Sequence, residues 1–239
     1  MDSSRRGWLV AALGTGAVSA LGVGEAGALA GVQTKPKAAG ASKPIGEEDV
    51  WPDEDLMREH GVLNRILLVY DEAIRRIRAH EEVPLEQVRS AAGIIRRFVE
   101  GYHEKLEEEH LFPRFEKAGK LTDLVGVLRV QHEAGRRVTA AILDVATRGA
   151  SAMDAAALAD HLGQFVRMYR PHEAREDTVL FPALREIVTR PEFERLGEEF
   201  EGQEDKVLGE HGFERVVDEV AGIERALGIY ELANFTPKV

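Results

Sequence analysis

The chain has 239 residues, enough for one substantial domain or two small ones, and its composition of 44% hydrophobic and 31% charged residues is that of a globular protein. The formal net charge of −11 argues against nucleic-acid binding, because a phosphate-binding surface needs a basic patch. The absence of cysteine excludes disulfides, thiolate zinc sites and iron–sulfur clusters, so a bound metal would have to be held by histidine and carboxylate.

The first residues have the features of an export signal. Paired arginines in Ser4-Arg5-Arg6-Gly7-Trp8-Leu9 precede an uncharged, Gly- and Ala-rich apolar run, and Ala28-Leu29-Ala30 fits an A-x-A cleavage signal. This pattern resembles a twin-arginine export signal. We therefore expect residues 1–30 to direct the chain through the twin-arginine export machinery to the periplasm or another extracytoplasmic location. The alternative is an uncleaved membrane anchor, because the run approaches the roughly 20 residues that span a bilayer.

Residues 31–52 are rich in Lys, Pro, Ala and Gly and are predicted to be a flexible linker. From Asp53 onward, apolar residues recur at spacings of three, four and seven, which predicts helices. Further helices are expected to begin near Pro84, Thr122 and Ser151. Four helices with short connections predict an all-α fold, an antiparallel up-down-up-down four-helix bundle over residues 53–190. Residues 191–239 form a predicted helical extension, with an additional C-terminal helix covering the bundle.

One motif occurs twice. His103 to Pro113 and His172 to Pro182 both read H-E-x-x-E-[ED]-x-x-L-F-P. Residues four apart on an α-helix lie about 40° apart around the axis, so each copy presents an imidazole and a carboxylate from one face. Pro171 and the two Phe-Pro pairs predict bends in the helices that carry the motif.

Each predicted helix carries one inward-facing histidine near its middle, and two of the helices add a carboxylate. These candidate metal ligands are His60, His103, Glu107, His132, His172 and Glu176. Buried imidazoles and carboxylates are costly in an apolar bundle unless a cation compensates them. Four imidazoles and two bridging carboxylates suit two iron ions with an open position for dioxygen, peroxide or nitric oxide, although manganese or a mixed centre would use the same donors.

The order His, H-x3-E, His, H-x3-E, together with Arg58-Glu59-His60-Gly61, Gln131-His132-Glu133 and the L-F-P tails, resembles the hemerythrin-like (HHE cation-binding) domain. The similarity covers roughly Asp53 to Ile187. It implies a four-helix bundle in which the six residues named above bind metal.

The sequence departs from hemerythrin oxygen carriers at two places. Those proteins have an H-x3-H pair on the third helix, whereas the residue four after His132 is Arg136. Their second carboxylate is an Asp five residues after its histidine, a spacing that Asp177 has, but helix geometry favours Glu176. Tyr169 lies on the face of His172 and is a possible additional site residue, as is Asp177. The missing histidine argues against reversible oxygen carriage and for sensing, iron handling or peroxide chemistry.

Several other interpretations fit less well. A ferritin-like oxidase needs E-x-x-H motifs on two different helices, whereas both matches here lie on the second helix. A zinc protease needs H-E-x-x-H, and both copies end in Glu instead. A purely structural acidic face would not require two matching copies and two further core histidines. The leading hypothesis is therefore a protein that binds or senses dioxygen, nitric oxide or iron, and the alternative is a catalase-like or iron-oxidising di-iron enzyme, for which Tyr169 would be the proton donor.

Overall fold

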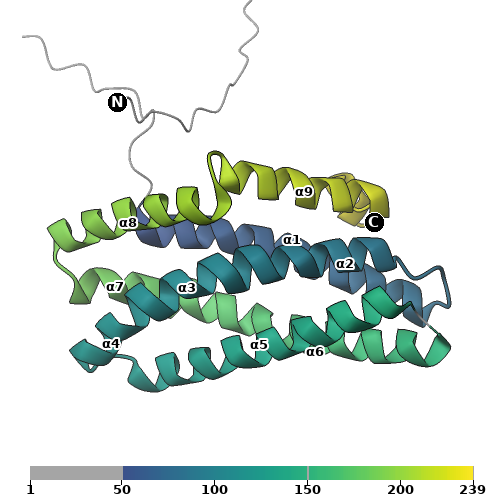
Figure 1. Cartoon of the computed structure of the whole chain (residues 1–239), viewed down its shortest axis with the longest axis horizontal. Helices are drawn as coiled ribbons and strands as arrows, with labels where there is room; N and C mark the ends of the chain where they lie inside the picture. Colours follow the sequence, from purple (N-terminus) through teal and green to yellow (C-terminus); the bar gives the residue numbers. More distant parts are fainter. Residues whose placement is uncertain (1–50, 150, 239) are drawn as a thin grey trace, which may run out of the picture. The chain divides into compact units, whose positions relative to one another are not determined.

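The computed structural model describes residues 51–149 and 151–238, and this part of the chain is helical with no β-strand (Figure 1). The all-α prediction is confirmed. The helices in chain order are α1 (Pro52–Arg78), α2 (Leu85–Ile94), η1 (Ile95–His103), α3 (Glu104–Leu106), η2 (Glu107–Leu111), α4 (Phe112–Ala118), α5 (Thr122–Arg148), α6 (Ala152–Arg175), η3 (Glu176–Leu180), α7 (Phe181–Ile187), α8 (Arg190–Leu208), α9 (Gly212–Leu227) and η4 (Leu232–Phe235). The expected signal peptide and nearly all of the linker lie outside the described residues. No helix within the described ranges is both long and apolar enough to cross a membrane.

Two of the long helical runs change their hydrogen-bonding pattern at the repeated motif. The run α2–η1–α3–η2–α4 and the run α6–η3–α7 each contain a π-helical turn, η2 or η3, immediately before Phe-Pro. In these turns the N–H of Phe112 donates to the carbonyl of Glu107, and that of Phe181 donates to the carbonyl of Glu176. The following proline has no N–H to continue the α-helical pattern. Each widened turn therefore begins at a carboxylate of the motif.

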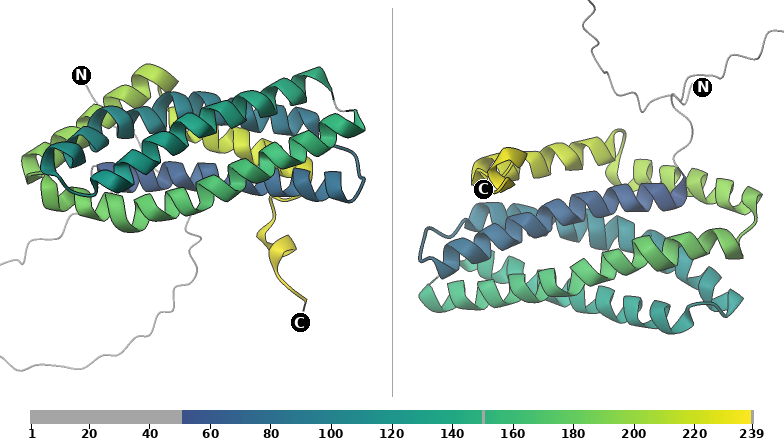
Figure 2. Two further views of the ribbon diagram at one scale, coloured as in Figure 1. Left: turned by 90° about the horizontal axis from the view of Figure 1, so that it is seen from below. Right: turned by 180° about the vertical axis from the view of Figure 1, so that it is seen from behind.

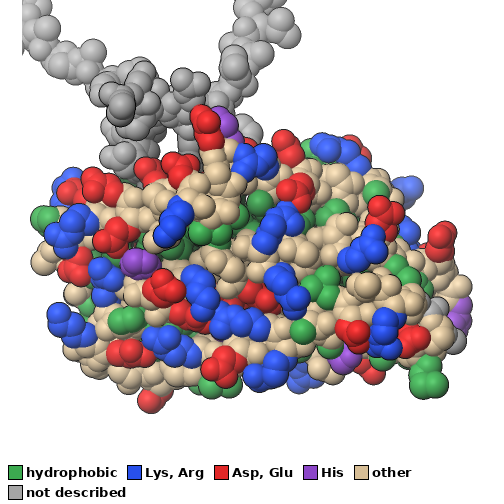
Figure 3. Space-filling view, viewed as in Figure 1, with side chains coloured by type: hydrophobic (Ala, Val, Ile, Leu, Met, Phe, Trp, Pro, Cys, Tyr) green, Lys and Arg blue, Asp and Glu red, His purple; other side chains and the backbone are tan. Residues whose placement is uncertain are grey.

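The helices lie lengthwise beside one another (Figures 1 and 2). α1 packs against α6, α6 against α5, α5 against α2, and α2 against α1, so that these four elements surround one core. Large aromatic side chains fill it, including Tyr70, Phe98, Tyr102, Phe112, Phe165, Tyr169 and Phe181. On the face shown in Figure 3, acidic and basic side chains are interspersed.

The C-terminal segment forms two α-helices, α8 and α9, followed by the short 3-10 helix η4, whereas the sequence predicts one C-terminal helix. Both pack against α1, and α9 also packs against α2. Arg65 of α1 forms a two-pronged ion pair with the buried Glu224 of α9, with distances of 3.0 Å from Nε to Oε1 and 2.6 Å from Nη2 to Oε2. The extension is therefore attached to the first two helices by polar as well as apolar contacts.

Candidate metal centre

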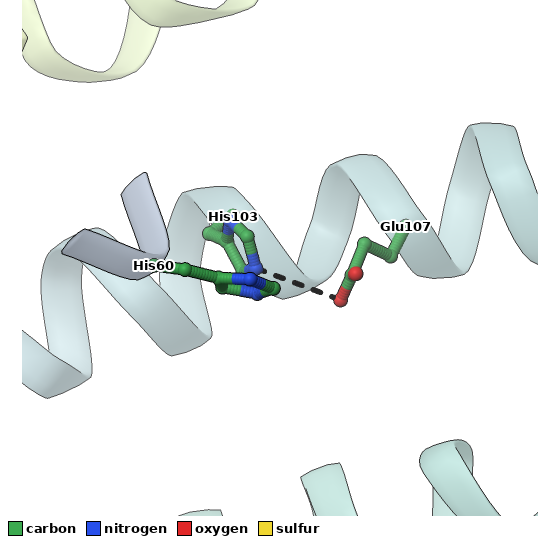
Figure 4. Close-up of side chains that lie close together, drawn as sticks. All are labelled: His60, His103 and Glu107. Atoms are coloured by element: carbon green, nitrogen blue, oxygen red, sulfur yellow. Dashed lines mark ion pairs between the residues drawn. The ribbon is translucent and has the colours of Figure 1, made fainter. Parts of the chain in front are cut away.

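Six polar side chains converge in the middle of the bundle. His60 comes from α1, His103 from the end of η1, His132 from α5 and His172 from α6, while Glu107 and Glu176 begin the π-helical turns η2 and η3. All six are between 0% and 4% exposed. Figure 4 shows His60 and His103 side by side, with the carboxylate of Glu107 directed toward them. The structure thus brings together all six residues that the sequence singles out.

The six side chains form two groups of three. His60, His103 and Glu107 make one group, and His132, His172 and Glu176 the other, with the ligand atoms of each group within 4.8 Å of one another. The carboxylates nevertheless face both groups. Glu107 Oε2 lies 3.8 Å from His103 Nε2 and 3.4 Å from His132 Nε2. Glu176 Oε2 lies 3.2 Å from His172 Nε2 and 3.5 Å from His60 Nε2, so each carboxylate is placed between the two histidine pairs.

A second ring of side chains holds the histidines from behind. His103 Nδ1 lies 2.7 Å from Glu59, His132 Nδ1 3.1 Å from Glu108, His172 Nδ1 2.8 Å from Gln131, and His60 Nδ1 2.7 Å from Asp177. Each of these acceptors is next in sequence to a residue of the centre but supports a histidine on a different helix. The supports therefore run from one helix to the next around the bundle. A hydrogen bond at Nδ1 directs the Nε2 lone pair of each ring inward, as in metal sites where a carboxylate or carbonyl fixes the ligating histidine.

The central carboxylates lack hydrogen-bond donors. No residue in the described part of the chain donates a hydrogen bond to the four carboxylate oxygens of Glu107 and Glu176, although histidine nitrogens lie within ion-pair distance of them. Burial, reinforced by the charge of Glu176, raises the pKa of Glu107 well above its ordinary value. A buried carboxylate without donors is costly unless a cation compensates it. The centre therefore has the acceptors that a metal ion would satisfy.

The pKa shifts of His103 and Glu176 favour the forms of these two side chains that bind a cation. Burial lowers the pKa of His103 well below its ordinary value, and the neighbouring histidines add to this shift, so the ring is held neutral. Burial acts to raise the pKa of Glu176, but His172 and the other nearby histidines outweigh it and lower that pKa. Neutral imidazoles and ionised carboxylates are the forms that bind metal. The all-nitrogen and oxygen donor set fits iron or manganese.

The two additional candidates lie outside this inner set. Asp177 is on the outer side of His60, at Nδ1, and its side chain is 34% exposed. Tyr169 donates its hydroxyl proton to Glu104 Oε1 at 2.7 Å. Gly135 leaves room for this hydroxyl, because a Cβ at that position would lie 2.1 Å from the tyrosine oxygen.

Arg136, four residues after His132, makes two ion pairs beside the centre. Its Nη2 lies 2.7 Å from Glu104 Oε2 and 2.6 Å from Glu108 Oε1. Glu104, Glu108 and His132 could by themselves form a third group of metal-binding type. The guanidinium occupies the position between the two carboxylates and supplies the positive charge there.

The second ring of side chains, which supports the histidines at Nδ1, was not predicted from the sequence. Glu59, Glu108 and Gln131 lie inside the motifs quoted above, but each was included only as the neighbour of a candidate ligand, with no role of its own. A polar residue next to each candidate ligand is a signal that could have predicted them. Successive residues of a helix point about 100° apart, so two neighbours can contact two different adjacent helices. Knowing which histidine each one reaches required the packing of the bundle.

The chain is similar to known proteins over most of its length. A family model described as "Hemerythrin HHE cation binding domain" matches residues 52–184. Uncharacterized proteins of Mycobacterium bovis and of two Mycobacterium tuberculosis strains are each 50% identical over 223 residues, which is 92% of this chain and 87% of each relative. No solved structure gives a significant match.

Proposed function

The chain belongs to the hemerythrin HHE cation-binding family, and from this premise we propose that it is a non-haem di-iron protein that binds or senses dioxygen, nitric oxide or iron. His60, His103, His132 and His172 would be the nitrogen ligands of the two ions, and Glu107 and Glu176 would be the carboxylate ligands. The helices that carry them would form the up-down-up-down bundle of the family. Manganese or a mixed pair would use the same donors.

One observation carries the proposal: four inward-facing imidazole nitrogens surround two buried carboxylates that have no hydrogen-bond donor in the described part of the chain. Each carboxylate faces one histidine of either pair. An arrangement of this kind is costly in an apolar core and becomes favourable when cations neutralise it.

The residues of the chain divide the work between them. A bound ferrous pair would supply electrons and an open coordination position for a diatomic ligand or peroxide. The six inner side chains would hold the two ions, and the four acceptors at Nδ1 fix the histidine rings. The aromatic core around them, including Phe112 stacked on His132 and Phe181 stacked on His60, excludes water from the centre.

Binding is favoured over turnover by the state of Tyr169. An enzyme that consumes peroxide needs a proton donor at the open position. The proton of Tyr169 is directed at Glu104, and burial together with the charge of Glu104 raises the pKa of the tyrosine well above its ordinary value. This residue is therefore poorly suited to give up a proton.

The proposal is tested by metal analysis of the purified protein and its variants. We expect about two irons per chain, a sharp loss in His103→Ala and in His172→Ala, and no loss in His80→Ala. Equal iron in all these variants would contradict it. Adding peroxide to the iron-loaded protein tests the enzyme alternative: sustained oxygen evolution that Tyr169→Phe abolishes would favour an enzyme, whereas a stable coloured adduct with oxygen or nitric oxide would favour a binding protein.

We also propose that the chain is exported by the twin-arginine machinery. Support comes from Arg5 and Arg6 ahead of a Gly-rich apolar run, and from the metal centre itself, since that machinery carries folded cargo and so allows metal uptake before export. Cell fractionation should place the wild-type protein outside the cytoplasm. A variant with both arginines changed to lysine should be retained inside, and export of that variant would contradict the proposal.

A further inference from the structure

The ring of side chains behind the four histidines is chemically uneven. His60 and His103 are supported by the carboxylates of Asp177 and Glu59. His132 is supported by the carboxylate of Glu108, but His172 is supported by the side-chain amide of Gln131. Three of the four supports are therefore acids, and the one neutral support lies behind the pair His132 and His172.

The carboxylate behind His132 is also shared with cations. Glu108 Oε1 lies 2.6 Å from Arg136 Nη2, and Glu108 Oε2 lies 2.7 Å from Lys105 Nζ. These two cations compensate much of the negative charge of Glu108, so Glu108 supports His132 less strongly than an unshared carboxylate would.

The inner ligands do not create this difference. Each histidine pair comprises two imidazoles, and each central carboxylate faces one histidine of either pair. The two positions therefore have matching inner donors, and what distinguishes them is the ring behind. A carboxylate acceptor at Nδ1 makes the opposite ring nitrogen a stronger ligand, and loss of such a partner typically costs about 10- to 100-fold in metal affinity.

We propose that the two metal positions are unequal, with His60 and His103 forming the tighter one and His132 and His172 the weaker one, and that Gln131 sets the difference. This inference rests on the proposed di-metal centre. It predicts that the centre fills in two steps, and that the metal beside His132 and His172 is the one lost first under chelation. The expected gap in affinity is about 10- to 100-fold.

The test is a titration of metal-stripped protein with cobalt(II) alone, followed by calorimetry and by the visible spectrum of the bound ion. Two cations repel each other, so a gap in the wild type does not by itself identify its cause. Two isosteric variants identify the cause of the gap in affinity. Gln131→Glu should tighten the second step by about tenfold and leave the first unchanged, whereas Asp177→Asn should weaken the first step by about tenfold and leave the second unchanged.

A control separates this effect from net charge. Gln164→Glu adds the same charge on the exposed face of α6 and should change neither step. Equal affinities in the wild type, a first step unaffected by Asp177→Asn, or a second step unaffected by Gln131→Glu would overturn the inference while leaving a di-metal centre in place. If cobalt does not bind to the wild type at all, the proposed function fails together with it.

Discussion

Replacing Glu107 by glutamine is expected to separate the stability of the metal-free protein from its ability to bind metal. Glu107 is 0% exposed, and no described residue donates a hydrogen bond to its carboxylate. Burial and the charge of Glu176 raise the pKa of Glu107 well above its ordinary value. A carboxylate of this kind costs several kcal/mol when ionised. The isosteric amide removes most of that cost, so Glu107→Gln should stabilise the metal-free protein by about 2 kcal/mol near neutral pH, equivalent to a rise in Tm of roughly 4–8 °C.

The same substitution should weaken metal binding. Four-ligand zinc sites are worth about 10–16 kcal/mol, or about 3 kcal/mol for each ligand, so losing a shared ligand should lower affinity by about 100-fold. The stabilisation also depends on pH in a defined direction. Because the folded-state pKa of Glu107 is raised, its contribution to wild-type stability is present below the unfolded pKa and is lost as pH rises through the folded one. The advantage of the variant should therefore grow with pH.

Urea denaturation of chelator-treated protein from pH 4 to pH 9, together with calorimetric metal titration, measures both effects. Glu176→Gln is the matched control, because nearby histidines lower the pKa of Glu176, whereas burial and Glu176 raise that of Glu107, so ionisation of Glu176 costs much less. That variant should lose metal affinity to a similar extent but destabilise the metal-free protein. The reasoning is refuted if Glu107→Gln destabilises the metal-free protein as Glu176→Gln does, or if it binds metal like the wild type.

Three further predictions concern protons, a close contact and the C-terminal extension. Metal binding should release a proton at pH values below the raised pKa of Glu107, so that metal affinity falls as pH falls. Calorimetry in buffers of different ionisation enthalpy should detect the released proton, and Glu107→Gln should release one proton fewer than the wild type. Gly135→Ala should destabilise the protein by about 1–3 kcal/mol in thermal denaturation, because the new methyl meets the Tyr169 hydroxyl, whereas Gly126→Ala on the same helix meets nothing within 4 Å and should stabilise by about 0.5–1 kcal/mol. Arg65→Met should lower the free energy of unfolding by about 1–3 kcal/mol, because it leaves the buried Glu224 without its ion pair. Arg148→Met breaks an exposed ion pair with Asp144 and should change that free energy by no more than about 0.5 kcal/mol. Equal losses of stability within the glycine pair or within the arginine pair would contradict the corresponding explanation.

Much of the fold could be predicted because most of the helices are marked by local sequence signals. Apolar residues at helical spacing, the Ser151–Asp154 capping box and Pro84 before α2 mark helices that the structure contains. The extension was harder to predict. The single turn between α8 and α9 depends on Gly209 and His211, both with positive φ, and on a contact from the Phe213 N–H to the buried Glu204. That contact belongs to packing and leaves little trace in the sequence pattern.

Four of the six inner residues could be predicted from the repeated motif, and His60 and His132 from their inward positions near the middle of the two other predicted helices. The surroundings of these residues could not. The π-helical turns at Glu107 and Glu176 change which residues share a face, and the sequence analysis assumed α-helical geometry throughout. The partner of each histidine lies on another helix, as with Glu59 and His103, so the pairing follows from how the helices are arranged. Tyr169 illustrates the limit: its face was predicted correctly relative to His172, but its hydrogen bond to Glu104 was not.

The most direct test of the metal centre is a crystal structure of the iron-loaded protein with anomalous scattering recorded at the iron absorption edge. We expect two anomalous peaks in the bundle core, one beside His60 and His103 and one beside His132 and His172, with Glu107 and Glu176 between them. A core without anomalous density, or iron bound only by surface carboxylates, would contradict this expectation.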